Sequence, residues 1–153
     1  PQRSGLRAAR DSEVFEDLRD RVAAAGKPTV FLACLGAQRD FGGREQFTSN
    51  LLLVGGFSIA RSEGGTTDEI VAQVRQTGAS MVILCSSAKV YADQAMTVAT
   101  ALKDAGVATV FVAGRTAEVA DEAVDTVIDG AVFDGMDVVA FSNATLDRLG
   151  AGK

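Results

Sequence analysis

The residues best suited to chemistry lie directly after the first strongly apolar run of the sequence. This polar stretch, Gly36–Gly43, contains Gln38, Arg39 and Asp40. An amide, a guanidinium and a carboxylate could bind a ligand, but Arg39 and Asp40 could equally be solvated turn residues that pair weakly with each other. The stretch therefore indicates either a ligand loop or an ordinary polar turn.

A second polar position follows the third apolar run, at Ser86 and Ser87. Their hydroxyl groups either donate hydrogen bonds to a ligand or cap the helix that comes next. Tyr91, the only tyrosine of the chain, either lines the same rim or packs on that helix.

The residue types that are absent exclude much enzyme chemistry. The chain contains no histidine, so it has no histidine general base, no Ser–His or Cys–His nucleophile pair and no histidine ligand for zinc, iron or cobalt. Gly36–Gly43 also lacks the glycine spacing of dinucleotide-binding loops and of P-loops. Cys34 and Cys85 each lie inside an apolar run, where reduced thiols that pack as small apolar groups are expected. We predict no catalytic residue and no metal ligand.

The composition also restricts the possible partners. The 153 residues carry a formal net charge of −5 without a cluster of lysine and arginine, which disfavours nucleic acids and anionic membranes as partners. No apolar run approaches the ~20 residues that span a bilayer, and residues 1–10 show no secretory signal. We expect a cytoplasmic protein.

Short apolar runs alternate with longer amphipathic segments, which is the pattern of repeated βα units around a parallel sheet. We predict an α/β fold with a doubly wound, five-stranded parallel sheet of the flavodoxin-like (Rossmann-like) type, in the order 2-1-3-4-5. Its ligand site should lie beyond the carboxyl ends of the strands. The predicted strands are Thr29–Leu35, Phe57–Arg61, Ser80–Ser86, Thr109–Ala113 and Thr126–Phe133.

Helical spacing marks the segments between these strands. The recurring apolar positions are Phe47, Leu51 and Val54, then Ile70 and Val74, and then Val98, Ala101 and Leu102. Further patterns predict helices over Ala117–Val124 and Met136–Leu149. Before the first strand, Val14, Leu18 and Val22 predict an additional amphipathic helix, which we expect to present apolar surface to a larger assembly.

Three segments that each follow a predicted strand carry a resemblance to a known family. They are Gln38–Gly43, Cys85–Ser87 and Ala113–Gly114. The sequence is similar here to the cobalamin-binding domain of the methylmalonyl-CoA mutase family, whose cobalamin-binding members have Asp-x-His-x-x-Gly, Ser-x-Leu and Gly-Gly at these places. Asp40 replaces the histidine that binds cobalt, and Gln38 replaces the aspartate that supports it. Ser87 replaces the leucine and Ala113 the first glycine.

The resemblance covers almost the whole chain and includes Arg10–Arg19, which is similar to the segment that enters this domain from the catalytic barrel in the mutases. It implies a retained framework that has lost its ligand residues. The positions of this vestigial pocket are Gln38, Asp40, Gly43, Ser86, Ser87, Ala113 and Gly114, and none is expected to bind a cofactor or a metal ion.

The pattern resembles the small subunits of heterodimeric bacterial members of the family. There the large subunit holds adenosylcobalamin, and the holoenzyme, an isomerase, interconverts methylmalonyl-CoA and succinyl-CoA. The implied role of this chain is a non-catalytic assembly domain whose partners are the large subunit and an upstream barrel of its own polypeptide. On this hypothesis residues 1–27 form a linker and a helix, and residues 28–153 form the cobalamin-binding-like α/β domain.

Two alternatives remain open at this stage. The chain could be the cobalamin-binding domain of an acyl-CoA mutase that uses a non-histidine binding mode, or it could be a small-molecule sensor that uses the same crevice. Binding measurements with cobalamins and acyl-CoAs discriminate among the three, because the assembly hypothesis expects neither to bind.

Overall fold

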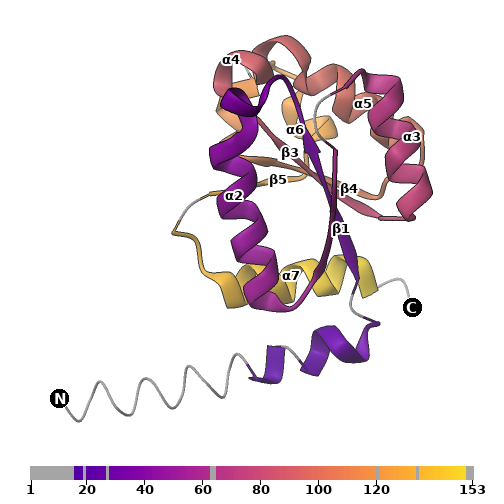
Figure 1. The fold of residues 1–153 in the computed structure, drawn as a ribbon, viewed down its shortest axis with the longest axis vertical. Helices are drawn as coiled ribbons and strands as arrows, with labels where there is room; N and C mark the ends of the chain where they lie inside the picture. Colours follow the sequence, from indigo (N-terminus) through magenta and orange to yellow (C-terminus); the bar gives the residue numbers. More distant parts are fainter. Residues whose placement is uncertain are drawn as a thin grey trace, which may run out of the picture.

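The apolar runs of the sequence form one sheet of five parallel strands. The computed structural model describes residues 16–18, 20–26, 28–62, 65–119, 121–133 and 135–150. The strand order is β2-β1-β3-β4-β5, which confirms the predicted winding (Figure 1). The strands are β1 (Thr29–Cys34), β2 (Ser58–Arg61), β3 (Met81–Cys85), β4 (Thr109–Ala113) and β5 (Gly130–Val132).

Apart from Thr29, the neighbouring strands β1 and β3 are apolar, because helices cover both of their faces. Every residue of β3 is buried, and in β1 only Thr29 is partly exposed. The helical segments are α2 (Gln38–Gly55), α3 (Thr67–Thr77), α4 (Ala88–Val90), the π-helix η1 (Tyr91–Ala95), α5 (Met96–Asp104), the 3₁₀ helix η2 (Thr116–Val119), α6 (Val124–Val127) and α7 (Val138–Gly150).

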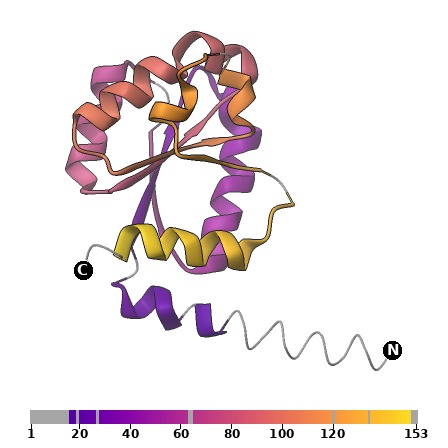
Figure 2. The same cartoon turned by 180° about the vertical axis from the view of Figure 1, so that it is seen from behind.

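Two apolar clusters fill the space between the sheet and its helices. Helices α2 and α7 pack on one face, and α3, α5 and α6 pack on the other (Figure 1, Figure 2). Because α2 begins directly after β1, and α4 directly after β3, the first turns of these helices lie at the carboxyl edge of the sheet. This is the edge at which the ligand site was expected.

An N-terminal helix, formed by residues 16–18 and 20–24, lies beside α7 (Figure 2). Leu18 and Val22 are buried in the same cluster as α2 and α7, and Arg21 bonds the side chains of Asn143 and Asp147. The described part of the expected apolar face, Leu18 and Val22, is therefore buried within the chain, whereas Ala23 and Ala24 of the same helix are exposed. Val14 and the predicted linker, residues 1–10, lie outside the described residues.

The structure corrects three predicted segments. The stretch Gly36–Gly43 is not a long loop, because α2 already begins at Gln38. Thr126–Phe133 is a strand only from Gly130, since α6 takes up its first residues. The helix predicted over Ala117–Val124 is instead a 3₁₀ turn that ends at Val119, followed by the short α6.

Cys34 and Cys85 are buried and form no disulfide, which confirms the expected burial. They occupy partner positions in the register of β1 and β3. A hydrogen bond with Cys34, together with burial, raises the pKa of the Cys85 thiol well above its usual value. Among the described residues, no helix is both long and apolar enough to cross a membrane.

Candidate functional site

Tyr91 is the centre of the polar contacts at the carboxyl ends of the strands. The residue is only 1% exposed, and its hydroxyl group donates a hydrogen bond to the carbonyl of Ala113 at the end of β4, over 2.5 Å. The same oxygen lies 3.0 Å from the carbonyl of Leu84 in β3 and accepts a hydrogen bond from the N–H of Ser86 over 2.9 Å. Tyr91 therefore joins β3 to β4 from within, and it does not line an exposed rim.

The π-helical turn η1 explains how the tyrosine reaches this place. Tyr91 is its first residue, directly after the three-residue helix α4. A π turn inserts an extra residue into a helix and thereby redirects the side chains around it, and such turns are frequent at functional sites.

The two serines after β3 both serve the fold. Ser86 Oγ donates a hydrogen bond to the carbonyl of Leu35, just past the end of β1, over 2.7 Å. Ser87 Oγ accepts a hydrogen bond from the N–H of Val90 and caps α4. Of the two interpretations of these serines, the structure favours capping for Ser87 and a link between strand ends for Ser86.

Asp40 lies where the family motif places the cobalt-binding histidine, and here it caps α2. Its carboxylate accepts a hydrogen bond from the N–H of Ala37 over 3.0 Å. That amide would otherwise be one of the unpaired donors at a helix N-terminus, where a negative charge is also favourable. Gly36, the residue before Ala37, has a φ of +79°. A Cβ at Gly36 would lie 2.9 Å from the carboxylate of Asp40, so the turn requires glycine.

Arg44 and Glu118 close the same region from the side of α2. Arg44 Nη1 donates hydrogen bonds to the carbonyl of Ala113, over 3.2 Å, and to the carboxylate of Glu118 in η2. The two charged side chains are 29% and 23% exposed. The guanidinium carbon lies 5.5 Å from the centre of the Tyr91 ring, which is within the range of a cation–π interaction. Arg44, Tyr91 and Glu118, with Ser86, are called the strand-end cluster below.

Gly114 makes this arrangement possible. Its φ is +122°, and a Cβ at this residue would lie 2.5 Å from Arg44 Nη1 and 3.0 Å from the carboxylate of Glu118. Gly114 matches the second glycine of the family's Gly-Gly motif. In this chain the space of the missing side chain is taken by the arginine.

Burial and hydrogen bonding set the charges of the cluster. Burial raises the pKa of the Tyr91 hydroxyl well above its usual value and Cys85 adds to the shift, while the hydrogen bond from Ser86 and the contact with Arg44 oppose it. Burial acts to lower the pKa of Arg44, but the contacts with Glu118 and Tyr91 outweigh burial and raise it. Tyr91 is therefore neutral and Arg44 is charged at neutral pH.

The structure gathers Ser86, Ala113 and Gly114 but leaves two other predicted positions apart. Gln38 is exposed in the first turn of α2, with its side-chain amide beside Gly42 of the same helix. Gly43 is exposed, with open space where a side chain would be. Ala113 is fully buried and contributes only its backbone carbonyl.

Sequence reasoning did not identify Arg44 or Glu118, and it left the role of Tyr91 open. Arg44 and Glu118 are 74 residues apart, and neither lies in a motif. The only signal was the position of Arg44, one residue beyond the polar stretch that follows β1.

The donors and acceptors of the strand-end cluster are largely paired with one another, so its evident chemical task is to hold the ends of β1, β3 and β4 together. Within the described ranges, no group of three or more His, Cys, Asp or Glu side chains could hold a metal ion.

Comparisons with known proteins support the resemblance seen in the motifs. Over 156 aligned residues that include the whole chain, 50% are identical to the methylmalonyl-CoA mutase small subunit of Propionibacterium freudenreichii subsp. shermanii. The chain is homologous to methylmalonyl-CoA mutase small subunits. The small subunit of the same name from Streptomyces virginiae is 40% identical over 95% of the chain. In both cases the chain spans about a quarter of the small subunit, 24% of its length.

The fold also has a likeness among solved structures. A chain described as a yeast Spc42 trimeric coiled coil fused to another protein matches 82% of this chain and 80% of its own length, with a TM-score of 0.53 and 12% identity. This likeness concerns the fold alone. No protein-family model matches this chain.

Proposed function

We propose that this chain is a non-catalytic assembly domain of a methylmalonyl-CoA mutase small subunit and that its cobalamin site is vestigial. In this proposal the holoenzyme is a cytoplasmic heterodimer that interconverts methylmalonyl-CoA and succinyl-CoA. Adenosylcobalamin belongs to the large subunit, and this domain contributes packing surface. The names of the relatives support the assignment to the mutase.

The observation that carries the proposal is the strand-end cluster. In open parallel sheets, ligands bind outside the carboxyl ends of the strands, where the strand order reverses. Here Tyr91 and Arg44 hold that edge with hydrogen bonds to the backbone of β3 and β4 and to Ser86. A ligand that displaced Tyr91 would leave these buried backbone groups unpaired, at a cost of about 1–3 kcal/mol for each.

The residue at the histidine position supports the same conclusion. Asp40 is engaged with the N–H of Ala37, and a carboxylate oxygen is a harder ligand than an imidazole nitrogen. Burying that carboxylate beneath a corrin ring without a compensating charge would cost on the order of several kcal/mol. The residues present do not fit a histidine-ligated cobalamin, since the sequence contains no histidine.

A retention experiment tests the proposal. The purified chain and the full-length small subunit are each mixed with excess hydroxocobalamin or adenosylcobalamin, desalted, and examined by visible spectroscopy. We expect colourless protein, and no binding of methylmalonyl-CoA in a separate titration. A stoichiometric corrin band would overturn the proposal and favour the alternative, a cobalamin-binding domain with a non-histidine mode.

Two variants separate the missing ligand from the occupied space. Gln38→Asp combined with Asp40→His restores the side chains of the family motif, but it leaves Tyr91 and Arg44 in place, so we expect this variant to remain colourless. Adding Tyr91→Ala and Arg44→Ala to it removes the side chains that fill the strand ends. If the first variant alone retains cobalamin, the strand-end cluster does not obstruct the site.

A further inference from the structure

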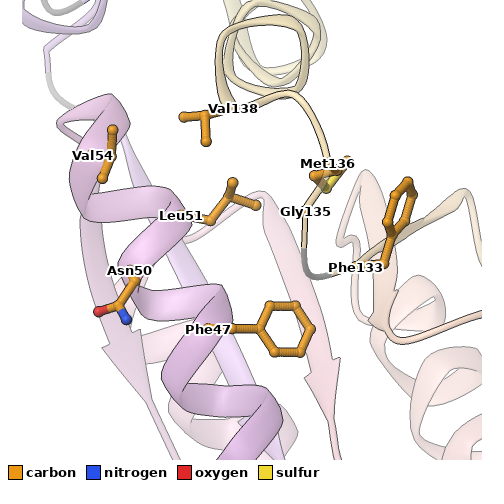
Figure 3. Close-up of a pocket in the computed structure, with 8 residues that line it drawn as sticks. All are labelled: Phe47, Asn50, Leu51, Val54, Phe133, Gly135, Met136 and Val138. Carbon is orange, nitrogen blue, oxygen red and sulfur yellow. The ribbon is translucent and has the colours of Figure 1, made fainter.

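Two of the three large apolar side chains that the described residues expose line one groove. They are Val54 and Phe133, each 39% exposed, whereas Leu53 is not among the lining residues. The groove lies between α2 and the segment that connects β5 to α7 (Figure 3). Its lining residues are Phe47, Asn50, Leu51, Val54, Phe133, Gly135, Met136 and Val138.

One face of α2 forms the first wall of the groove. Phe47, Leu51 and Val54 recur at intervals of three and four residues, which places them on one side of the helix. Phe47 and Leu51 point toward the segment that carries Phe133 and Met136, whereas Asn50 points away (Figure 3). The helix face that packs on the core thus continues outward, past the buried Leu51, onto the surface.

A positive charge borders the opposite wall. The guanidinium carbon of Arg115 lies 5.4 Å from the centre of the Phe133 ring. Arg115 is exposed and takes part in none of the ion pairs formed among the described residues. The groove thus combines apolar walls with a bordering arginine. Aromatic residues, methionine and arginine are the residue types enriched in protein interfaces.

We propose that this groove is the docking surface for the large subunit of the mutase, which inserts apolar side chains between α2 and Phe133 and places a carboxylate beside Arg115. This inference rests on the proposed function. The name "small subunit" of both relatives implies a larger partner, and an exposed apolar patch of this kind marks an interaction site on a folded protein. A protein surface suits the groove better than a small polar ligand, since among the described lining residues only Asn50 has a polar side chain, and it is turned away.

The test uses full-length small subunit and its large subunit, with a charge placed in the groove. Val54→Asp puts a carboxylate on the apolar wall at an exposed position. The matched control is Thr100→Asp, which adds the same charge to an exposed residue of similar shape on α5, on the other face of the sheet. Subunit affinity is measured by sedimentation. We expect Val54→Asp to weaken association at least tenfold and Thr100→Asp to change it less than twofold.

Two further variants refine the result. Phe133→Asp changes the exposed aromatic residue of the opposite wall and should also weaken association. Arg115→Ala should weaken it about threefold, with a loss of part of its salt dependence, because a rim charge acts mainly on encounter.

Wild-type affinity in both Val54→Asp and Phe133→Asp would overturn the inference. It would also be overturned if these variants lowered the melting temperature of the full-length small subunit alone, since the groove would then be covered by another part of the same polypeptide. These outcomes are independent of the corrin spectrum, which tests the proposed function by itself.

Discussion

The strand-end cluster and the groove on α2 differ in whether their side chains are covered by the described part of the chain. At the strand ends, Tyr91, Ser86 and Arg44 pair with backbone and side-chain groups of the chain itself. In the groove, the described residues leave Val54 and Phe133 each 39% exposed. The polar groups of the first region are thus paired among the described residues, whereas those residues leave the apolar groups of the second region partly uncovered.

If the proposed function holds, this difference is the one expected of a domain that has lost a ligand site and kept an assembly surface. Polar groups that had faced a ligand would need new partners, because a buried polar group without a hydrogen bond is costly. A tyrosine and an arginine can supply those bonds from within the chain. Exposed apolar side chains have no such substitute and gain only when another surface covers them.

Tyr91→Phe should produce the largest loss of stability, because it removes the hydroxyl group that joins the ends of β3 and β4. The variant keeps the ring but leaves the N–H of Ser86 and the carbonyl of Ala113 without their partner, which should cost about 2–4 kcal/mol. Denaturant unfolding measures the change. Thr97→Val removes an exposed hydroxyl nearby and should change stability by less than about 0.5 kcal/mol.

The same variant gives a pH signature. The pKa of Tyr91 is raised in the folded chain, so the unfolded chain, with a tyrosine pKa of about 10, releases this proton first. The stabilisation is therefore present below pH ~10 and falls as the pH rises further, by at most about 1.4 kcal/mol per pH unit. The stability difference between wild type and Tyr91→Phe should narrow above pH ~10. A constant difference across this range would contradict the buried, neutral tyrosine.

Gly114→Ala should produce the next largest loss of stability, because it forces a methyl group against Arg44. Gly106→Ala is the matched control, since Gly106 also has a positive φ, +99°, but open space around the added carbon. Both variants should lose about 1–3 kcal/mol from backbone strain. Gly114→Ala should lose about 1 kcal/mol more, because it also disturbs a charge-assisted hydrogen bond. Combining Gly114→Ala with Arg44→Ala should remove that excess, and an additive double variant would show that the two residues do not interact.

The sequence predicted the sheet well but the strand-end cluster poorly, for physical reasons. Continuous apolar runs specify buried parallel strands, and β4 was predicted with its observed bounds, Thr109–Ala113. Gly42 and Gly43 suggested a loop, yet they lie within α2, where the cap formed by Asp40 starts the helix earlier. The link between Arg44 and Glu118 depends on the tertiary fold, and no local pattern records it.

Asp40→Ala should cause a smaller loss of stability, because it removes only the carboxylate that caps α2. Losing the carboxylate that accepts from Ala37 should cost about 1 kcal/mol, the usual value of a helix cap. Asp68→Ala, in the first turn of α3, removes an exposed carboxylate with no such bond and should cost only about 0.3 kcal/mol, the lower end of the helix-dipole effect of an exposed charge. Equal losses in thermal unfolding would indicate that Asp40 acts through its charge and not through its hydrogen bond.

Val54→Lys should have the smallest effect on stability, because the groove is already partly exposed. The side chain is 39% exposed, and surface substitutions of this kind usually change stability by less than about 0.5 kcal/mol. Its effect should be seen in the exposed apolar surface: the chain alone should bind less of a dye that reports such surface. Ala72→Lys, at an exposed residue of α3, adds the same charge away from the groove and should leave dye binding unchanged. If Val54→Lys destabilised the chain as strongly as Tyr91→Phe, the groove would be part of the internal packing, and the contrast between the two regions would fail.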